Sequence, residues 1–94
     1  MELLWSPLAR AQLREARDFI AQDNPDAADR LVAAIETAAA HLLVFPQSGQ
    51  ATGQRRRAWQ VPRTPFRLIY RVRGERLDIL MVWHGARAWP FDES

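Results

Sequence analysis

A signal for the start of a helix occurs twice in the first half of the chain, at Ser6-Pro7 and at Asn24-Pro25. In each pair the first side chain can cap a helix, and the proline fits the first helical position because no N–H is needed there. The apolar residues that follow recur every three or four positions, which is the period of one helix face. They are Ala9, Leu13, Ala16 and Ile20 after the first signal, and Ala28, Leu31, Val32, Ile35, Ala39 and Leu42 after the second. Because Pro46 cannot continue a helix, the pattern predicts a hairpin of two antiparallel helices that ends at about Phe45.

The apolar pattern changes to a period of two after residue 54, which is typical of half-buried strands. It predicts strands at residues 57–61, 66–73 and 77–83, and the short apolar run Glu2–Trp5 predicts another strand at the start of the chain. The run 77–83 is nearly all apolar, so it is the best candidate for a central strand that is covered on both faces. The small polar residues from Gln47 to Gln54 predict a surface loop.

The order of these elements is strand, helix, helix and then three strands in a meander, which predicts an α+β fold. We expect the strands to form one mainly antiparallel sheet, with the helical hairpin on one of its faces. The chain has 94 residues, of which 48% are hydrophobic. Because a chain of this size has room for one modest core, we expect residues 1–94 to be a single domain.

Several kinds of site and protein are excluded by what the sequence lacks. The absence of cysteine excludes a disulfide scaffold and a thiolate zinc site. The four glycines are scattered, so there is no glycine-rich phosphate loop. His41 is in the second predicted helix and His84 follows the last strand, so we expect no metal ion, and no cofactor either. No apolar run approaches the ~20 residues of a membrane span, and the N-terminus lacks the pattern of a secretion signal, so the expected compartment is the cytoplasm with no membrane partner.

Charge is divided unevenly between the two halves of the chain. Residues 1–54 contain four arginines and seven acidic residues, a net charge of −3. Residues 55–94 contain nine arginines and four acidic residues, a net charge of +5, and the chain has no lysine. Two interpretations remain open: a bias in composition, or a basic C-terminal half that meets phosphates or an acidic partner.

The basic residues of the predicted strand 66–73 point to a candidate binding face. Arg67, Arg71 and Arg73 share parity on that strand, so their side chains leave the same face of the sheet. Such a set suits a phosphate backbone or an acidic peptide, and the alternative is a charged face that only contacts solvent. Strand aromatics can stack on a partner or pack under the helices instead. The residues predicted to bind a target or an antitoxin are Arg57, Arg67, Arg71, Arg73, Trp59, Tyr70, Arg87 and Trp89.

Two further titratable features have both a functional and a structural interpretation. His84 can act as a general acid or base, or it can be a structural histidine at the end of a strand. Glu75 and Asp78 flank a predicted turn, and we expect this pair of carboxylates to be solvated.

Several short motifs occur in a characteristic order along most of the chain. They are Asp23-Asn24-Pro25 with Ala27-Ala28, Phe45-Pro46 with Gly49, the run from Pro65 to Val72, and the run from Ile79 to Arg87. In this order and at these distances the chain resembles the RelE/ParE superfamily of toxins from bacterial type II toxin–antitoxin systems, in particular its ParE-like branch. The resemblance implies a toxin that arrests growth until a cognate antitoxin covers it. It also implies an antitoxin with a DNA-binding N-terminal part and a disordered, acidic C-terminal segment that folds on the toxin.

The resemblance leaves open whether the chain is a ribonuclease. Ribonuclease members cut mRNA on the ribosome with basic residues on the sheet and a general acid or base near the C-terminus. Arg67 and Arg87 match two of those positions, and His84 is a candidate acid or base. Where those members have lysines and a terminal Tyr or His, this chain has Ala58, Gln60 and the ending Asp92-Glu93-Ser94.

ParE-like members instead poison DNA gyrase and need no nucleolytic site. Our first hypothesis is therefore a toxin that binds DNA gyrase and does not catalyse a reaction. The alternatives are a ribosome-dependent mRNA endoribonuclease that uses Arg67, Arg87 and His84, and a non-toxic binding module on the same fold.

Overall fold

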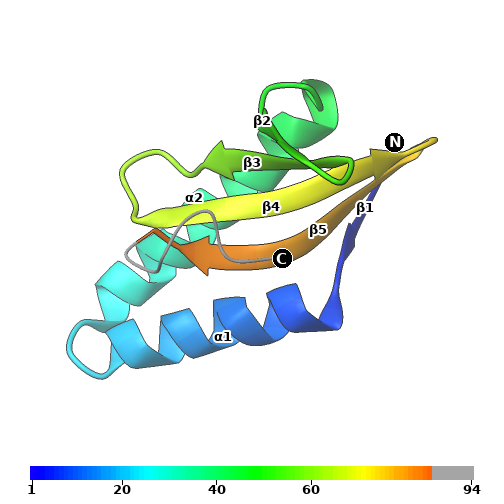
Figure 1. The fold of residues 1–94 in the computed structure, drawn as a ribbon. Helices are drawn as coiled ribbons and strands as arrows, with labels where there is room; N and C mark the ends of the chain where they lie inside the picture. Colours follow the sequence, from blue (N-terminus) through cyan, green and yellow to red (C-terminus); the bar gives the residue numbers. More distant parts are fainter. Residues whose placement is uncertain (86–94) are drawn as a thin grey trace.

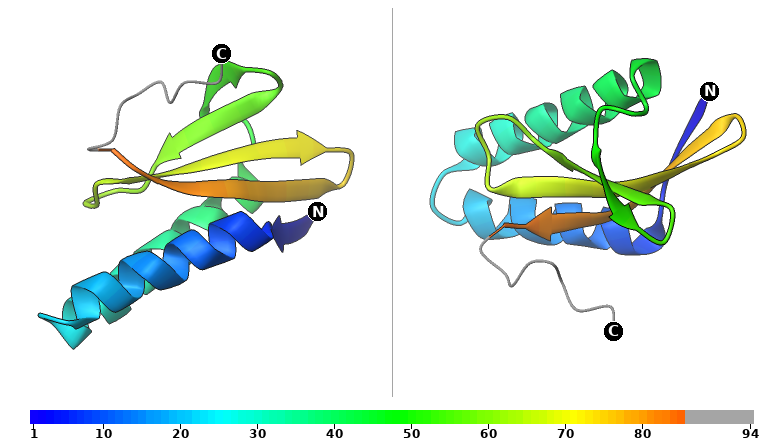
Figure 2. Two further views of the ribbon diagram at one scale, coloured as in Figure 1. Left: turned by 60° about the horizontal axis from the view of Figure 1, so that its bottom comes forward. Right: turned by 45° about the horizontal axis from the view of Figure 1, so that its top comes forward.

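The structure is a computed structural model, and it describes residues 1–85. In this range two helices pack on one face of a five-stranded sheet (Figure 1). Helix α1 spans Pro7–Ala21 and α2 spans Pro25–Val44. The strands are β1 (Glu2–Trp5), β2 (Gln50–Gly53), β3 (Arg56–Gln60), β4 (Phe66–Arg73) and β5 (Arg76–His84). The two further views in Figure 2 show both helices on the same side of the sheet. We call that side the helix face and the opposite side the outer face.

Both helices begin at the signals seen in the sequence. Ser6 Oγ accepts a hydrogen bond from Ala9 N (2.9 Å) at the start of α1. Asn24 Oδ1 accepts one from Ala27 N (3.0 Å) at the start of α2. Each cap satisfies an N–H that has no partner within its helix, and the predicted helix hairpin is confirmed.

The strand order is β1-β5-β4-β3-β2, with β1 parallel to β5 and the other neighbours antiparallel. The predicted meander of three antiparallel strands is present as β3, β4 and β5. The predicted loop is wrong in part, because Gln50–Gly53 within it pairs with β3 and extends the meander by a fourth strand. All four residues of β2 are exposed, so the strand has no apolar alternation that would reveal it. Residues 77–83 belong to an interior strand, as predicted, since β5 lies between β1 and β4, and the middle strand of the five is β4.

The start of α1 is attached to the edge of β5. Strand β1 covers only the first half of β5, because its last pairing is with Ile79. Beyond that point, Ser6 Oγ donates to Leu80 O (2.8 Å), and Val82 N donates to Gln12 Oε1 (2.8 Å). These two bonds satisfy backbone groups that would otherwise lie open at a strand edge, and they hold α1 beside β5.

The core lies between the helices and the helix face of the sheet. Its buried residues are Ala9, Leu31, Ile35, Ala38, Ala39, Leu42, Val61, Phe66, Leu68, Tyr70, Leu77, Ile79 and Val82. Tyr70 on β4 is fully buried, and its hydroxyl donates to Pro46 O (2.8 Å) and accepts from Gly49 N (2.9 Å). A Cβ on Gly49 would lie 2.6 Å from Tyr70 Oη, so the close approach of the loop after α2 requires glycine at this position.

Candidate functional site

The arginines predicted as one binding set leave the sheet on two different faces. Arg67, Arg71 and Arg73 alternate along β4 with residues of the core, so their side chains are on the outer face. Arg57 pairs with Tyr70 and is therefore on the helix face. There its Nη1 donates to Gly49 O (2.8 Å), so it anchors the loop that follows α2.

The two strand aromatics of the predicted set belong to the helix face. Tyr70 has no exposed surface, so its ring is not available to a partner, which corrects its place in that set. Trp59 is partly buried against the core, and its ring stacks on that of His41 with centroids 4.9 Å apart and an interplanar angle of 18°. For both residues, packing under the helices is the interpretation that the structure supports. Arg87 and Trp89 lie outside the described residues.

Burial also changes the chemistry of the Tyr70 hydroxyl. Removal from water raises the pKa of this group above its usual value of 10.0, because the charged phenolate loses more solvation than the neutral phenol. The hydrogen bond from the Gly49 backbone and the charge of Arg57 act in the opposite direction and are weaker. Tyr70 therefore stays protonated and serves as a hydrogen-bonded part of the core.

The described members of the predicted ribonuclease set lie on opposite faces of the sheet. Arg67 is on the outer face, where its Nε donates to Gln60 Oε1 (3.1 Å). His84 pairs with Phe66 and meets its ring edge-on on the helix face, with centroids 5.0 Å apart. Cooperation in phosphate cleavage requires two groups that reach the same reacting atoms. Arg67 and His84 do not converge in this way.

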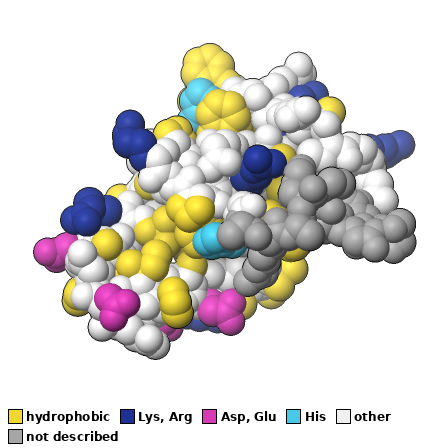
Figure 3. All heavy atoms as spheres, turned by 60° about the vertical axis from the view of Figure 1, so that its left-hand side comes forward, with side chains coloured by type: hydrophobic (Ala, Val, Ile, Leu, Met, Phe, Trp, Pro, Cys, Tyr) yellow, Lys and Arg dark blue, Asp and Glu magenta, His cyan; other side chains and the backbone are white. Residues whose placement is uncertain are grey.

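A groove of about 910 Å³ opens on the helix side of the molecule. It lies between the two helices, the β3–β4 turn and the end of β5, where His84 is part of its wall. Figure 3 shows hydrophobic side chains gathered in a hollow on this side, beside a histidine. The apolar lining includes Ala16, Phe19, Ile20, Leu31, Phe66 and Val82. Phe19 is 72% exposed, so residues 1–85 leave apolar side-chain surface of the groove uncovered.

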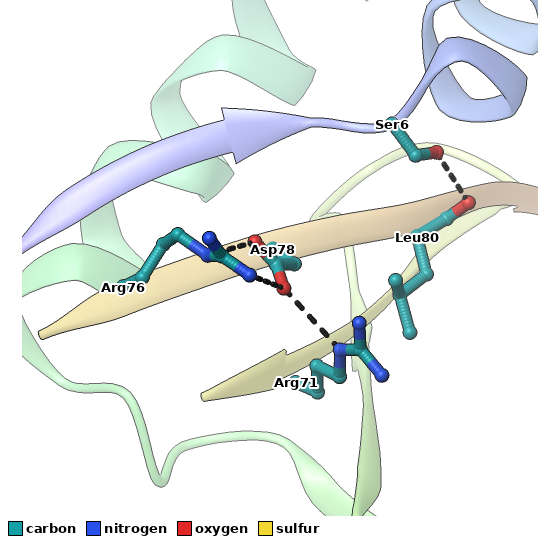
Figure 4. A network of polar contacts seen from close by, with 5 residues as sticks. All are labelled: Ser6, Arg71, Arg76, Asp78 and Leu80. Carbon is teal, nitrogen blue, oxygen red and sulfur yellow. Dashed lines mark hydrogen bonds and ion pairs between the residues drawn. The ribbon is translucent and has the colours of Figure 1, made fainter. Parts of the chain in front are cut away.

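A buried carboxylate on the outer face is the feature that the sequence interpretation missed. Asp78 is only 8% exposed, although we expected it to be solvated. Its Oδ2 accepts a hydrogen bond from Arg71 Nε (3.2 Å), and its Oδ1 forms an ion pair with Arg76 Nε (3.0 Å), as Figure 4 shows. The available signal was a lone carboxylate inside the apolar run 77–83, because a buried charge needs a partner of opposite charge.

The described residues contain neither a cluster of metal-ligating side chains nor a helix of membrane-spanning character. Within residues 1–85, no three His, Cys, Asp or Glu side chains come together in a way that could hold a metal ion. Neither of the two helices in this range is long and apolar enough to cross a membrane.

Known proteins of one family are similar to this chain over nearly its whole length. Residues 3–89 match the model of a family described as the ParE toxin of the type II toxin–antitoxin system parDE. The Putative toxin Y4kP of Sinorhizobium fredii and Toxin RelE2 of Caulobacter vibrioides are each 34% identical over 87 residues, which is 92% of this chain and 90% and 97% of the respective relatives. A solved structure described as the chromosomal ParDE TA system from P. aeruginosa is similar with a TM-score of 0.79 and 25% identity, covering 89% of this chain and 95% of that one.

Proposed function

Because the chain belongs to the ParE toxin family of type II toxin–antitoxin systems, we propose that it arrests growth by binding a cellular target without cutting nucleic acid, and that this target is DNA gyrase. A toxin of this kind has a cognate antitoxin as its partner. The proposal therefore involves two contacts, one with the target and one with the antitoxin.

One observation carries the non-catalytic part of the proposal. The arginine and the histidine that a ribonuclease of this superfamily would use, Arg67 and His84, are separated by the sheet. General acid–base catalysis needs its groups within hydrogen-bond reach of the reacting atoms. Their separation supports a toxin that acts by occupying its target.

The proposal is tested with the purified toxin and purified DNA gyrase. We expect the toxin to inhibit supercoiling and to increase the amount of the covalent complex between gyrase and cleaved DNA. The variant Arg71→Ala/Arg73→Ala should inhibit less, because it removes two cations from the outer face, whereas the control Arg10→Ala/Arg14→Ala on α1 should inhibit as the wild type does. Unchanged supercoiling and no cleaved complex would contradict gyrase as the target.

A second assay separates gyrase poisoning from cleavage of mRNA. The 5′ ends of mRNA are mapped in cells after the toxin is induced. We expect no cuts at fixed positions within codons. Such cuts would show a ribosome-dependent endoribonuclease, and normal growth without antitoxin would show a non-toxic binding module.

We propose that the antitoxin covers the apolar groove on the helix side. The groove is large and mainly apolar, and it includes Phe19, whose ring is mostly exposed. Arg30 and Arg63 also line it, together with one carboxylate, Glu15. The arginines outnumber the carboxylate, so a segment with one apolar side and acidic residues would match both the chemistry and the charge of the groove. Because most of this contact is apolar, we expect the affinity of the antitoxin to depend only weakly on salt.

A further inference from the structure

A group of four arginines lies together on the outer face, near the turn between β4 and β5. Arg71 and Arg73 are on β4, and Arg73 pairs directly with Arg76 on β5. Arg56 comes one position before Arg57, whose partner is Tyr70, so Arg56 lies beside Arg71 on the neighbouring strand. We call Arg56, Arg71, Arg73 and Arg76 the outer-face arginine cluster.

The carboxylate of Asp78 fixes two members of this cluster. It accepts from Arg71 Nε (3.2 Å) and from Arg76 Nη2 (3.5 Å) through Oδ2, and it forms an ion pair with Arg76 Nε (3.0 Å) through Oδ1. Figure 4 shows the carboxylate between the two guanidinium groups. The side chains of Arg71 and Arg76 are still 37% and 38% exposed, so both are held in place and remain accessible to a ligand.

The cluster keeps an excess of positive charge. Within residues 1–85, the Nη atoms of Arg71 make no hydrogen bond, and the guanidinium groups of Arg56 and Arg73 have neither a hydrogen bond nor an ion pair. The direct pairing of Arg73 with Arg76 places two like charges opposite each other, which destabilises a sheet. Two carboxylates, buried Asp78 and exposed Glu2, which pairs with Arg76 from β1, cannot neutralise four arginines, and an external anion would relieve this repulsion.

The chemistry around the cluster favours phosphate over an acidic peptide. A peptide partner normally needs an apolar anchor, and the apolar groove formed by the described residues lies on the helix side, away from this cluster. Forked guanidinium groups that are already oriented match the two free oxygens of a phosphodiester. The sheet face also presents them side by side on neighbouring strands, which suits a backbone with repeated charges.

We infer that the outer-face arginine cluster binds the phosphodiester backbone of nucleic acid, and that Asp78 is a positioning residue that orients Arg71 and Arg76 for this contact. The inference goes beyond the proposed function, because it does not depend on gyrase being the target. A toxin that leaves gyrase unaffected would still bind nucleic acid through this cluster.

The test measures binding of the full-length toxin to a short DNA duplex and to single-stranded RNA by fluorescence anisotropy, at several salt concentrations. For Arg71→Ala/Arg73→Ala we expect at least about tenfold weaker binding, with the slope of log affinity against log salt reduced by about 1 for each arginine. The control Arg10→Ala/Arg14→Ala removes the same charge from α1 and should bind nearly as the wild type does. The two nucleic acids identify the source of the phosphodiester, since the one bound more tightly is the preferred ligand.

The variant Asp78→Asn tests whether Asp78 acts by orienting the two arginines or only through its charge. This change removes one negative charge, so the net charge of the cluster rises by one and charge alone predicts tighter binding of nucleic acid. If Asp78 orients the two arginines, binding becomes weaker by about threefold or more despite the added charge. Arg71→Lys provides a second test, because it keeps the charge and loses the fork, and we expect it to bind more weakly as well.

Three results would overturn the inference. The first is equal binding by Arg71→Ala/Arg73→Ala and the α1 control. The second is tighter or unchanged binding by Asp78→Asn together with wild-type binding by Arg71→Lys. The third is cluster-dependent binding of polyglutamate with no binding of DNA or RNA, which would assign the cluster to an acidic protein partner. If Asp78→Asn does not fold, the arginine variants decide the outcome.

Discussion

The two faces of the sheet offer different kinds of contact. The helix face carries the core and continues into an apolar groove with an exposed phenylalanine. The outer face carries arginines arranged around one buried carboxylate. The difference shows that the basic C-terminal half of the sequence is not one basic surface, because alternation along each strand sends neighbouring residues to opposite sides. One face is suited to an apolar segment and the other to an anion.

The alternation of side chains between the two faces also separates the candidate ribonuclease residues. Arg67 and His84 are close to each other in the paired strands and still leave the sheet on opposite sides. Two separate surfaces allow the toxin to meet its target and its antitoxin at different places.

The largest expected effect concerns the stability that the helix face provides. Leu68→Ala removes a fully buried side chain of the core, and we expect it to lower the free energy of unfolding by about 3 kcal/mol. Arg73→Ala on the outer face of the same strand should change it by less than about 0.5 kcal/mol, because the side chain is exposed. Urea denaturation followed by circular dichroism measures both. Similar losses for the two variants would contradict the assignment of the core to one face.

The next effect is a change in the affinity of the antitoxin for the groove. Phe19→Asp places a charge where an apolar segment is proposed to dock, and we expect about thirtyfold weaker binding of the antitoxin, or roughly 2 kcal/mol. Leu8→Asp is the matched control, since Leu8 is also an exposed apolar residue of α1 and does not line the groove. Isothermal titration calorimetry gives both affinities. Equal weakening by the two variants would mean that the groove has no special part in antitoxin binding.

A smaller effect comes from the buried tyrosine. Tyr70→Phe leaves Pro46 O and Gly49 N without their partner, and we expect a loss of about 1–2 kcal/mol in the free energy of unfolding. Because burial raises the pKa of Tyr70 in the folded state, its contribution is complete below pH 10.0 and is lost as the pH rises through the folded-state pKa. Unfolding measured between pH 8 and 11 should show this loss in the wild type and not in the variant.

The ionisation of Tyr70 can also be followed directly. It is the only tyrosine in the chain, so the ultraviolet absorbance of phenolate reports on this residue alone. Phenolate formation in the folded protein at or below the usual pKa of tyrosine would contradict the buried position of Tyr70.

The smallest effect is at a turn that belongs to neither face. Gln54 and Arg55, between β2 and β3, have φ angles of 53° and 62°, which non-glycine residues rarely adopt and which a two-residue hairpin turn of this type requires. Gln54→Asn/Arg55→Gly should therefore stabilise the fold by about 1 kcal/mol. Gly74→Ala, at a φ of 59°, should destabilise it by a similar amount. Thermal unfolding measures both changes, and neither should alter binding at the groove, which these turns do not line.

The helices could be predicted from the sequence because their signals are local. A capping side chain followed by proline, and an apolar period of three to four, depend on neighbouring residues only. Strand β2 could not be found in this way, because its four residues are exposed and it is held by pairing with β3. The middle position of β4 could not be read from hydrophobicity either, because it depends on the addition of β1 at one edge of the sheet and of β2 at the other.

The candidate site could be predicted only in part, for a similar reason. Parity along β4 placed Arg67, Arg71 and Arg73 on one face, because alternation is a local property. Which face lies under the helices depends on tertiary packing, and so the burial of Tyr70 and the position of Arg57 required the structure. The partnership of Asp78 with two arginines depends on the register between β4 and β5, which the sequence does not specify.

Growth of cells that express toxin variants, with and without the antitoxin, tests the separation of the two faces most directly. We expect Phe19→Asp to arrest growth even when the antitoxin is present, because the target contact is intact and the antitoxin contact is weakened. We expect Arg71→Ala/Arg73→Ala to permit growth without antitoxin while still binding it. Neutralisation of Phe19→Asp at the wild-type level, together with full toxicity of Arg71→Ala/Arg73→Ala, would contradict the division of the two contacts between the two faces.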